Sequence, residues 1–298
     1  MRSEIDLHMH SFYSDDGEFS PKELVEKSRN MKIISVSDHN CVRANAEALA
    51  ESKKSGLGYI CAGEFDSVFS GINIHILGYG IDYEYNKFSE IEKNISADMV
   101  KNSEKRLEKT LNMGFDISVS ELKKISDRTR YKNVWTGEIF AEVILNKSKY
   151  KNSKILSPYR KGGNRSDNPY VSFYWDFYSQ GKPGYVPVNY LPSEEIIKII
   201  HESGGKAVLA HPGVNFKDKN DLFDKFTDSG IDGIEVFSSY HDTAETEYFY
   251  KTAKRKNLII TCGSDFHGKT KPSVFIGEFK TVVPYDEIEN NLKEFVLY

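Results

Sequence analysis

The stretch Ile5-Asp6-Leu7-His8-Met9-His10 is an apolar segment that reads as a β-strand and ends in two histidines. Side chains alternate along a strand, so His8 and His10 point to the same face and can share a metal ion. The stretch Ser264-Asp265-Phe266-His267 repeats this spacing near the other end of the chain. A His-x-His pattern alone is common, so the metal interpretation depends on what the other strands carry.

Working outward from these two stretches, we find a polar residue at or near the end of each further predicted strand. These residues are Asp38, His39, Glu64, His75 and His211. His75 alone is more often a packed core residue than a ligand, but six of the eight histidines occupy such positions. Imidazole and carboxylate ligands suit Zn, Mn or Fe(II). Because there are more ligands than one tetrahedral ion needs, the pattern predicts a cluster of two or three ions.

The alternation of strands and helices predicts the fold class. A capping box at Ser20-Pro21-Lys22-Glu23 predicts a helix over 23–30; further helices are predicted over 193–202, ahead of a strand at 206–210, and over 243–256, after a strand at 233–237. About seven strands, most followed by a helix, favour a parallel (β/α) barrel over an open doubly wound sheet, which periodicity alone does not exclude. The strand ends of such a barrel converge on one rim, where barrel active sites lie.

Composition limits the functions to consider. The chain has 298 residues, 39% hydrophobic and 28% charged, and a formal net charge of −4. We therefore expect no binding to long DNA, which needs a basic face. Three cysteines without a CxxC spacing, no apolar run long enough for a membrane span and no signal peptide lead us to expect a cytoplasmic protein. The sequence does not indicate an oligomeric state.

Seven motifs occur in the order expected of one known family. They are Asp6-Leu7-His8-Met9-His10, Ser14-Asp15-Asp16-Gly17, Ser37-Asp38-His39, Ala62-Gly63-Glu64, His75-Ile76-Leu77-Gly78, Ala210-His211-Pro212-Gly213 and Gly263-Ser264-Asp265-Phe266-His267. Together they resemble the PHP (polymerase and histidinol phosphatase) superfamily. The resemblance implies a distorted (β/α)7 barrel from residues 1–84 and 183–298, with a helical insertion domain, residues 85–182, over the active site.

The resemblance also implies three divalent ions (Mn, Fe or Zn) and a ligand set. The ligands would be His8, His10, Glu64 and Asp265 for one ion; Asp15, His39 and His267 for a second; and Glu64, His75 and His211 for a third. Asp15 is preferred because its offset from His10 matches the family, although Asp16 could replace it in Ser-Asp-Asp-Gly.

Within the superfamily, the chain resembles the stand-alone phosphoesterases that act on nucleoside 3′,5′-bisphosphates or trim short RNA. That branch carries an Arg-x-His-Phe-Ala-Arg type stretch in its insertion, whereas residues 135–142 read Trp-Thr-Gly-Glu-Ile-Phe-Ala-Glu. The phosphate grip would then come from other basic residues, namely Arg160, Lys161, Arg165 or Lys182. The aromatic residues of 170–178 are expected to form the insertion core rather than to stack on a base.

The resulting hypothesis is metal-assisted hydrolysis of a phosphate monoester or a short-RNA phosphodiester, with a small phosphorylated molecule, nucleotide or short RNA as the partner. Water activated between the ions attacks phosphorus, and His211, Asp265 or His241 protonates the leaving oxygen. His241 would also face the substrate, and Asp38 would orient a ligand histidine.

Three rival interpretations remain at this point. One is a histidinol-phosphate or other small-molecule phosphatase, and another is an amidohydrolase-like metallohydrolase. Amidohydrolases usually recruit a carbamylated lysine on a middle strand, and no strand-end lysine stands out here. The third is a non-enzymatic scaffold, which the intact ligand set disfavours.

Overall fold

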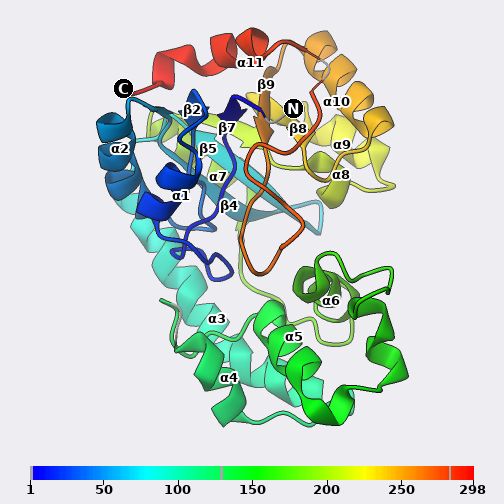
Figure 1. Cartoon of the computed structure of the whole chain (residues 1–298). Coiled ribbons are helices and arrows are strands. Elements are labelled where there is room, and N and C mark those ends of the chain that lie inside the picture. The colour runs from blue at the N-terminus through cyan, green and yellow to red at the C-terminus, as the bar shows by residue number, and fades with distance from the viewer. Residues whose placement is uncertain (1–2, 128–129, 282) are drawn as a thin grey trace.

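The computed structural model describes residues 3–127, 130–281 and 283–298. Figure 1 shows a barrel in its upper half and a helical unit below it. The long helix α3 (Asn86–Asn112) runs from the barrel into this unit, and the chain returns to the barrel before α7 (Ser193–Glu202). The helical unit is therefore an insertion in the barrel sequence.

The strands pair into two sheets. In chain order they are β1 (Ile5–Asp6), β2 (Ile33–Ile34), β3 (Gly58–Tyr59), β4 (Ala62–Phe69), β5 (Ile72–Tyr79), β6 (Leu191–Pro192), β7 (Lys206–Leu209), β8 (Gly233–Ser238) and β9 (Ile259–Gly263). The first sheet has the order β1-β2-β3, and the second has the order β6-β4-β5-β7-β8-β9.

Hydrogen bonds beyond the regular strands join the two sheets into a closed ring. On one side, Leu7 N donates to Cys262 O at 3.1 Å, which places β1 beside β9. On the other side, Glu64 N donates to Asp38 O at 3.1 Å, which places the extension of β2 beside β4. The sheet thus has no open seam at either junction, and the predicted distorted (β/α)7 barrel is confirmed.

One part of the barrel is not parallel. β5 runs antiparallel to β4 and to β7, whereas β7, β8 and β9 are parallel to one another. Only Ser70 and Gly71 separate β4 from β5, and both have positive φ, 48° and 82°. Such a two-residue turn reverses the chain, since a parallel connection needs a much longer crossover. His75 therefore lies in mid-strand, opposite Asp66, and not at a strand end.

Helices cover the barrel and build the insertion. They are α1 (Pro21–Lys27), α2 (Ala44–Ser55), α3, α4 (Val119–Ser126), α5 (Gly137–Asn146), α6 (Pro169–Phe177), α7, α8 (Pro212–Asn215), α9 (Asn220–Phe226), α10 (Thr243–Lys256) and α11 (Tyr285–Leu292), with 3-10 turns at Ser148–Tyr150, Lys154–Tyr159 and Lys293–Phe295. The capping box at Ser20 is present, with Pro21 at the first helical position, as predicted. No helix in these ranges is both long and apolar enough to cross a membrane.

The buried hydrophobic side chains of the described residues form two separate cores. The larger core lies in the barrel and includes Phe88, Ile91 and Ile95 from the first half of α3. The smaller core lies in the insertion, contains Phe115 and Phe173, and has Leu107 from the second half of α3 packed against it. The helix α3 therefore belongs to both cores and fixes the insertion on the barrel. The boundary expected at residue 85 falls just before this shared helix.

Candidate metal centre and its pocket

Side chains from widely separated strands meet at one rim of the barrel. They belong to three overlapping groups whose possible ligand atoms lie within 4.8 Å of one another. The groups are His8, His10, Glu64 and Asp265; His10, Asp16, His39 and His267; and His39, Glu64 and His75. The first group is the set that the resemblance implied for one ion.

The ion pairs within the first group are short and buried. His10 Nε2 lies 3.0 Å from Asp265 Oδ1, and His8 Nε2 lies 3.2 Å from Glu64 Oε2. His8, His10 and Glu64 have no exposed surface, and Asp265 is 2% exposed. Burial at this level excludes bulk water from the imidazoles and carboxylates, so they must satisfy one another or bind an ion.

The second group contains Asp16 in place of the preferred Asp15. Asp16 Oδ2 lies 3.1 Å from His267 Nε2, whereas Asp15 belongs to none of the groups formed by the described residues. The turn that carries both is very tight, because a Cβ on Gly17 would lie 2.0 Å from the Ser11 carbonyl oxygen. This turn directs Asp16 toward His267, and the preference for Asp15 is not supported by the geometry.

Glu64 links the third group to the rest. Its Oε1 is 3.0 Å from His75 Nδ1 and 2.9 Å from His211 Nε2, and its Oε2 is 3.1 Å from His39 Nδ1. His75 Nε2 faces Asp66 Oδ1 at 2.9 Å. One carboxylate thus touches both histidines expected for the third ion, and Glu64 also belongs to the group expected for the first ion.

The chemistry of the buried atoms fits a metal cluster. Several ring nitrogens and carboxylate oxygens have no hydrogen-bond partner among the described residues, although such atoms are normally satisfied when buried. They are His8 Nε2, His10 Nε2, Asp16 Oδ1, His39 Nδ1, Glu64 Oε2, His211 Nδ1, Asp265 Oδ1 and His267 Nε2. Divalent ions would use most of these lone pairs, so the residues present fit the group.

Two side chains that the sequence analysis missed orient these rings. Glu235, in the middle of β8, accepts from His8 Nδ1 at 2.8 Å through Oε1 and from His211 N at 2.8 Å through Oε2. Ser14 Oγ lies 2.9 Å from His10 Nδ1. Such outer contacts fix the ring so that Nε2 is presented to a metal. A glutamate inside the otherwise apolar strand Gly233–Phe237 was the available signal for Glu235.

The backbone is strained at two of the candidate ligands. His211 has φ 24° and Asp265 has φ 56°, both in the left-handed region that non-glycine residues rarely adopt. Strain of this kind persists only where surrounding contacts hold it, and it clusters at functional sites. Here, Asp265 N donates to His8 O at 2.8 Å, which ties the strained turn to the first strand.

Burial and neighbouring charges together set the protonation states of the candidate ligands. Burial opposes ionisation of Glu64, but His39, His8 and His75 outweigh it and hold the pKa of this carboxyl well below its usual range. Burial opposes the charged form of His8, but Glu235, Glu64 and Asp265 raise its pKa well above the ordinary value. Burial lowers the pKa of His267 to about 4, which keeps its imidazole neutral and able to bind a metal.

A pocket lies between this rim and the insertion. From the barrel it is lined by Asp16, His39, His75 and their neighbours, and from the insertion by residues that include Thr136, Glu138 and Tyr174. Burial and the nearby Asp16 raise the pKa of Glu138 to about 7. The pocket wall opposite the metal centre is thus partly acidic, as the loss of basic residues from 135–142 implies.

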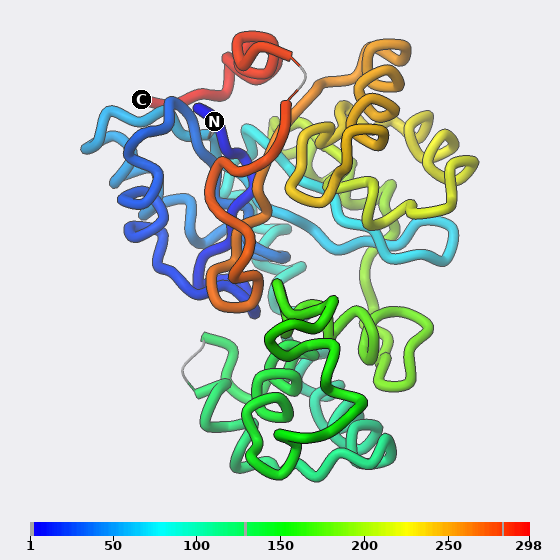
Figure 2. The backbone as a smooth tube through the Cα atoms, turned by 45° about the vertical axis from the view of Figure 1, so that its right-hand side comes forward, coloured from blue at the N-terminus to red at the C-terminus, as the bar shows by residue number. Residues whose placement is uncertain are grey.

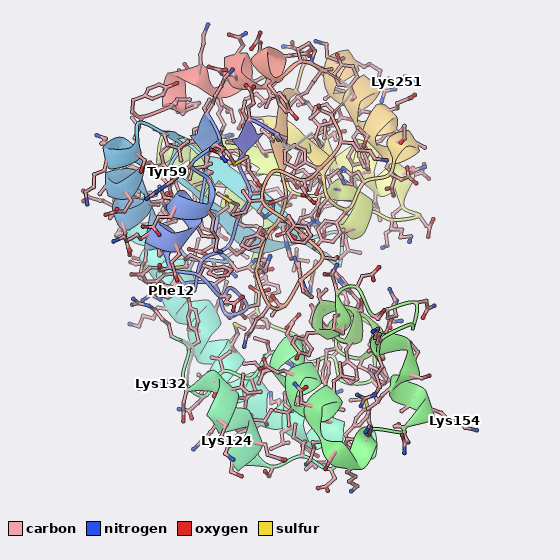
Figure 3. The ribbon with its side chains drawn as sticks, viewed as in Figure 1. Phe12, Tyr59, Lys124, Lys132, Lys154 and Lys251 are labelled. Atoms are coloured by element: carbon pink, nitrogen blue, oxygen red, sulfur yellow. The ribbon has the colours of Figure 1, made fainter. Side chains whose placement is uncertain are left out.

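The basic residues expected to grip phosphate do not line this pocket. Arg160 donates to Leu145 O and Tyr150 O inside the insertion, and Arg165 pairs with Asp176 at 2.6 Å. Lys161 and Lys182 are exposed. Figure 3 likewise shows Lys124, Lys132 and Lys154 at the periphery of the insertion. Sequence alone could not predict these directions, because they depend on how the insertion packs.

Two lysine or arginine side chains do line the pocket in the described residues, Arg106 and Lys271. Arg106, from α3, donates through Nη1 to Trp135 O. Lys271 is 7% exposed, and its Nζ lies 2.6 Å from Asp265 Oδ2. The sequence analysis missed Lys271, whose only signal was its position four residues after His267.

Two further predictions from the sequence concern His241 and Asp38. His241 Nδ1 is 2.8 Å from Val236 O and its Nε2 accepts from Gly213 N, so both ring nitrogens are engaged and the ring does not line the pocket. Asp38 accepts from Ser11 N and Oγ at 2.6 and 2.8 Å instead of orienting a histidine.

The aromatic residues of 170–178 divide between two roles. Phe173 and Tyr178 are buried in the insertion core, as expected. Tyr174 and Trp175 line the pocket, and Trp175 is 36% exposed. The helical period of α6 explains the division, because adjacent residues on a helix face different directions.

A (β/α) barrel with buried histidines and carboxylates gathered at one rim is typical of metal-dependent hydrolases. The PHP domain family matches residues 6–182, which is more than half of the chain, and the chain belongs to that family.

Two curated relatives span most of the chain. The 3′,5′-nucleoside bisphosphate phosphatase of Chromobacterium violaceum is 27% identical over 290 residues, 94% of this chain and 93% of the relative. The 5′-3′ exoribonuclease Rnm of Escherichia coli is 29% identical over 275 residues, 88% of this chain and 84% of the relative.

Two solved structures share the fold. An amidohydrolase from Chromobacterium violaceum superposes with a TM-score of 0.78 at 24% identity and covers 99% of this chain and 98% of its own. A protein from Bifidobacterium adolescentis, described as a metal-dependent phosphoesterase, gives a TM-score of 0.76 at 23% identity and covers 98% of this chain and 94% of its own. At this level of sequence identity, the structural similarity shows a shared fold and nothing about activity.

Proposed function

We propose that this member of the PHP family is a metal-dependent phosphoesterase that removes phosphate from a small monoester. The observation that carries the proposal is the set of buried ligand atoms without hydrogen-bond partners at the barrel rim. The curated relatives are named as a nucleoside bisphosphate phosphatase and an exoribonuclease, and both names describe the breaking of a phosphate ester bond. Both relatives align over most of the chain, which supports the same reaction class.

The proposed cofactors are three divalent ions, Mn, Fe or Zn. The ligands would be His8, His10, Glu64 and Asp265 for the first ion; Asp16, His39 and His267 for the second; and Glu64, His75 and His211 for the third. Bound ions of this kind supply Lewis acidity and lower the pKa of water toward neutrality. Within the chain, Glu235 and Ser14 keep the imidazoles in the required orientation.

We propose His211 as the proton donor to the leaving oxygen, because its Nδ1 is buried without a hydrogen-bond partner. Asp265 is less suited to this role: burial opposes its ionisation, but Lys271, His267 and His8 outweigh burial and hold the pKa of this carboxyl well below its usual range. His241 is a weaker candidate because Val236 O and Gly213 N occupy its two nitrogens.

The pocket supports a small nucleotide as the substrate. Trp175 and Tyr174 offer aromatic surface on which a base can stack, and the metal centre forms the opposite wall. A nucleoside 3′,5′-bisphosphate or the end of a short RNA would place one phosphate at the centre. A second phosphate would need a cation from the insertion, where Arg106 is the pocket-lining cation of the described residues.

A second candidate is a phosphate ester that carries an amino group, such as histidinol phosphate. Glu138 is 9% exposed and lines the pocket, and Thr136 hydrogen bonds to its side chain from within the insertion. A substrate ammonium or hydroxyl group would satisfy this side chain, whereas a second phosphate would be repelled by its ionised form.

Phosphate release by the Mn-loaded protein tests these candidates. The panel is adenosine 3′,5′-bisphosphate, AMP, histidinol phosphate and a short 5′-phosphorylated RNA, with cleavage of the RNA to mononucleotides scored in parallel. We expect turnover of at least one substrate and its loss in Asp265→Asn and His10→Ala, together with a reduced metal content. Asp221→Asn removes an exposed carboxylate and should behave as wild type.

The outcomes separate the candidates. Selective turnover of a nucleotide or RNA supports the first candidate, and selective turnover of histidinol phosphate supports the second. Full activity in Asp265→Asn or His10→Ala would reject the metal centre as the active site. No activity on any substrate with metal bound would reject both candidates.

A further inference from the structure

The loop that follows β9 reaches from the barrel toward the insertion (Figures 1 and 2). Ser273 N in this loop donates to Asn168 Oδ1 at 3.0 Å, and Lys269 Nζ lies 2.9 Å from Glu142 Oε2. The loop therefore spans one side of the pocket. Lys271 lies between these two contacts and lines the pocket itself.

The loop is held in place on the barrel side as well. Thr270 Oγ1 donates to Asp16 O at 2.9 Å, and Lys271 N donates to Gly268 O at 3.1 Å. Gly268 has φ 77°, and a Cβ there would lie 2.4 Å from Glu18 Oε2, so a side chain would disrupt the turn. These contacts fix the backbone of Lys271 before any substrate arrives.

The Lys271 side chain is buried against the metal centre. Its Nζ lies 2.6 Å from Asp265 Oδ2, while Asp265 Oδ1 faces His10 Nε2 at 3.0 Å. The ammonium also lies 5.3 Å from the centre of the Tyr240 ring. Asp265 thus divides its two oxygens, one toward the candidate metal ligands and one toward the lysine. A group bound at the metals would lie next to the ammonium.

A buried ammonium is costly unless all of its interactions are made, and it has three N–H donors. Asp265 is the one carboxylate of the described residues within 4 Å of Lys271 Nζ. The other pocket-lining cation, Arg106, donates to the Trp135 carbonyl on the insertion side. Lys271 is therefore the pocket cation that is in direct contact with a candidate metal ligand.

We infer that Lys271 binds the phosphoryl group that is hydrolysed, donating from Nζ to a non-bridging oxygen while it keeps its contact with Asp265. This inference rests on the proposed phosphoesterase function and assigns the phosphate grip to the loop after β9 instead of the insertion. A fixed ammonium at this position stabilises the negative charge of the phosphoryl oxygens without reorganisation.

Calorimetric titration of inorganic phosphate into the metal-loaded protein tests the inference without relying on turnover. We expect Lys271→Met to keep the wild-type metal content and to weaken the phosphate Kd by about tenfold to a hundredfold, the range for loss of a charge-assisted hydrogen bond. Lys280→Met removes the same charge from an exposed position further along the segment after β9 and should stay within about twofold of wild type.

The alternative is that Lys271 only neutralises Asp265. Lys271→Met would then lose bound metal, or would keep its metal and bind phosphate with wild-type affinity, and either result overturns the inference. If Lys271→Met does not fold, Lys271→Arg and Lys271→Gln replace it. The arginine variant should retain most of the phosphate affinity that the glutamine variant loses, and equal affinities would overturn the inference.

The failure of the proposed function is distinguishable. A metal-loaded wild-type protein that binds no phosphate and hydrolyses no substrate of the panel rejects the proposed function before any variant is compared. A wild-type protein that binds phosphate, with an unaffected Lys271→Met, rejects only the role of Lys271.

Discussion

Glu64 is the residue with the most contacts in the candidate metal centre. Its carboxylate lies within 3.3 Å of ring nitrogens from His8, His10, His39, His75 and His211. It is fully buried, so no water can replace these contacts. Its position after an apolar strand was readable from the sequence, but the number of its partners was not, because the five histidines come from four separate strand segments.

The choice between Asp15 and Asp16 shows where sequence spacing stops being informative. Both residues lie in a short turn, and a one-residue difference in offset does not determine which side chain faces His267. In the same turn the backbone of Gly17 passes so close to Ser11 that a Cβ would lie 2.0 Å from the Ser11 carbonyl oxygen. This contact is between backbones, and no local sequence pattern predicted it.

Asp16→Asn and Asp15→Asn provide a direct comparison. We expect Asp16→Asn to lower the affinity for the second ion by at least about tenfold, because it removes an anionic oxygen beside His267. Asp15→Asn should keep the wild-type metal content. Elemental analysis of the two purified variants after dialysis measures their metal content. Metal loss in Asp15→Asn alone would show that Asp15, the ligand chosen from sequence spacing, is the correct one.

At the scale of elements, the direction of β5 was readable but was not recognised. Ser70 and Gly71 alone separate it from β4, and a parallel crossover of two residues is impossible. By contrast, the helices α1 and α10 were well predicted. Ser20 and Asp242 are their N-cap residues, and each forms a capping box. A helix cap depends on residues that are close in the sequence, whereas the order of strands in a sheet depends on residues that are far apart in it.

The contact between β1 and β9 depends on a glycine. A Cβ at Gly263 would lie 2.1 Å from His8 Cβ and 2.7 Å from Glu235 Oε1. The motif Gly263-Ser264-Asp265-Phe266-His267 contained this glycine, but its packing role appears only when the strand that carries His8 lies beside it.

Gly263→Ala should therefore damage both stability and metal binding. We expect a loss of about 1–3 kcal/mol in the free energy of unfolding, the range for overpacking, together with reduced metal content because His8 is displaced. Urea unfolding and elemental analysis measure the two effects. Gly162→Ala, at a positive φ with open space around it, should cost about 1 kcal/mol and leave the metal content unchanged.

At the scale of the whole molecule, the candidate active-site pocket lies between two separately packed cores. The sequence predicted a helical insertion and a metal centre; the insertion is present, and the residues expected for the metal centre gather into groups that could hold ions. It did not predict that Glu138 and Tyr174 would face the centre while Arg160 and Arg165 would not. The orientation of the insertion depends on α3, whose two halves pack on different cores.

Removing the metal should destabilise the barrel. Without ions, several buried ligand atoms of the candidate centre have no hydrogen-bond partner among the described residues, and ligand binding to the folded state alone stabilises it by mass action. We expect chelation to lower the Tm by roughly 5–10 °C, which corresponds to about 3 kcal/mol in a chain of this size. Calorimetry with and without chelator measures the shift. Asp265→Asn should show a smaller shift, and an unchanged wild-type Tm would contradict the prediction.

The pairing of β1 with β9 also governs when the protein can acquire its metals in the cell. A ribosome produces about 5–20 residues per second, so Asp265 follows His8 by roughly 10–50 seconds. During that time the first histidines are made but have neither Asp265 nor His267 beside them. The complete candidate site can therefore form only after the last strand leaves the exit tunnel, so metal would be bound only when synthesis is nearly complete.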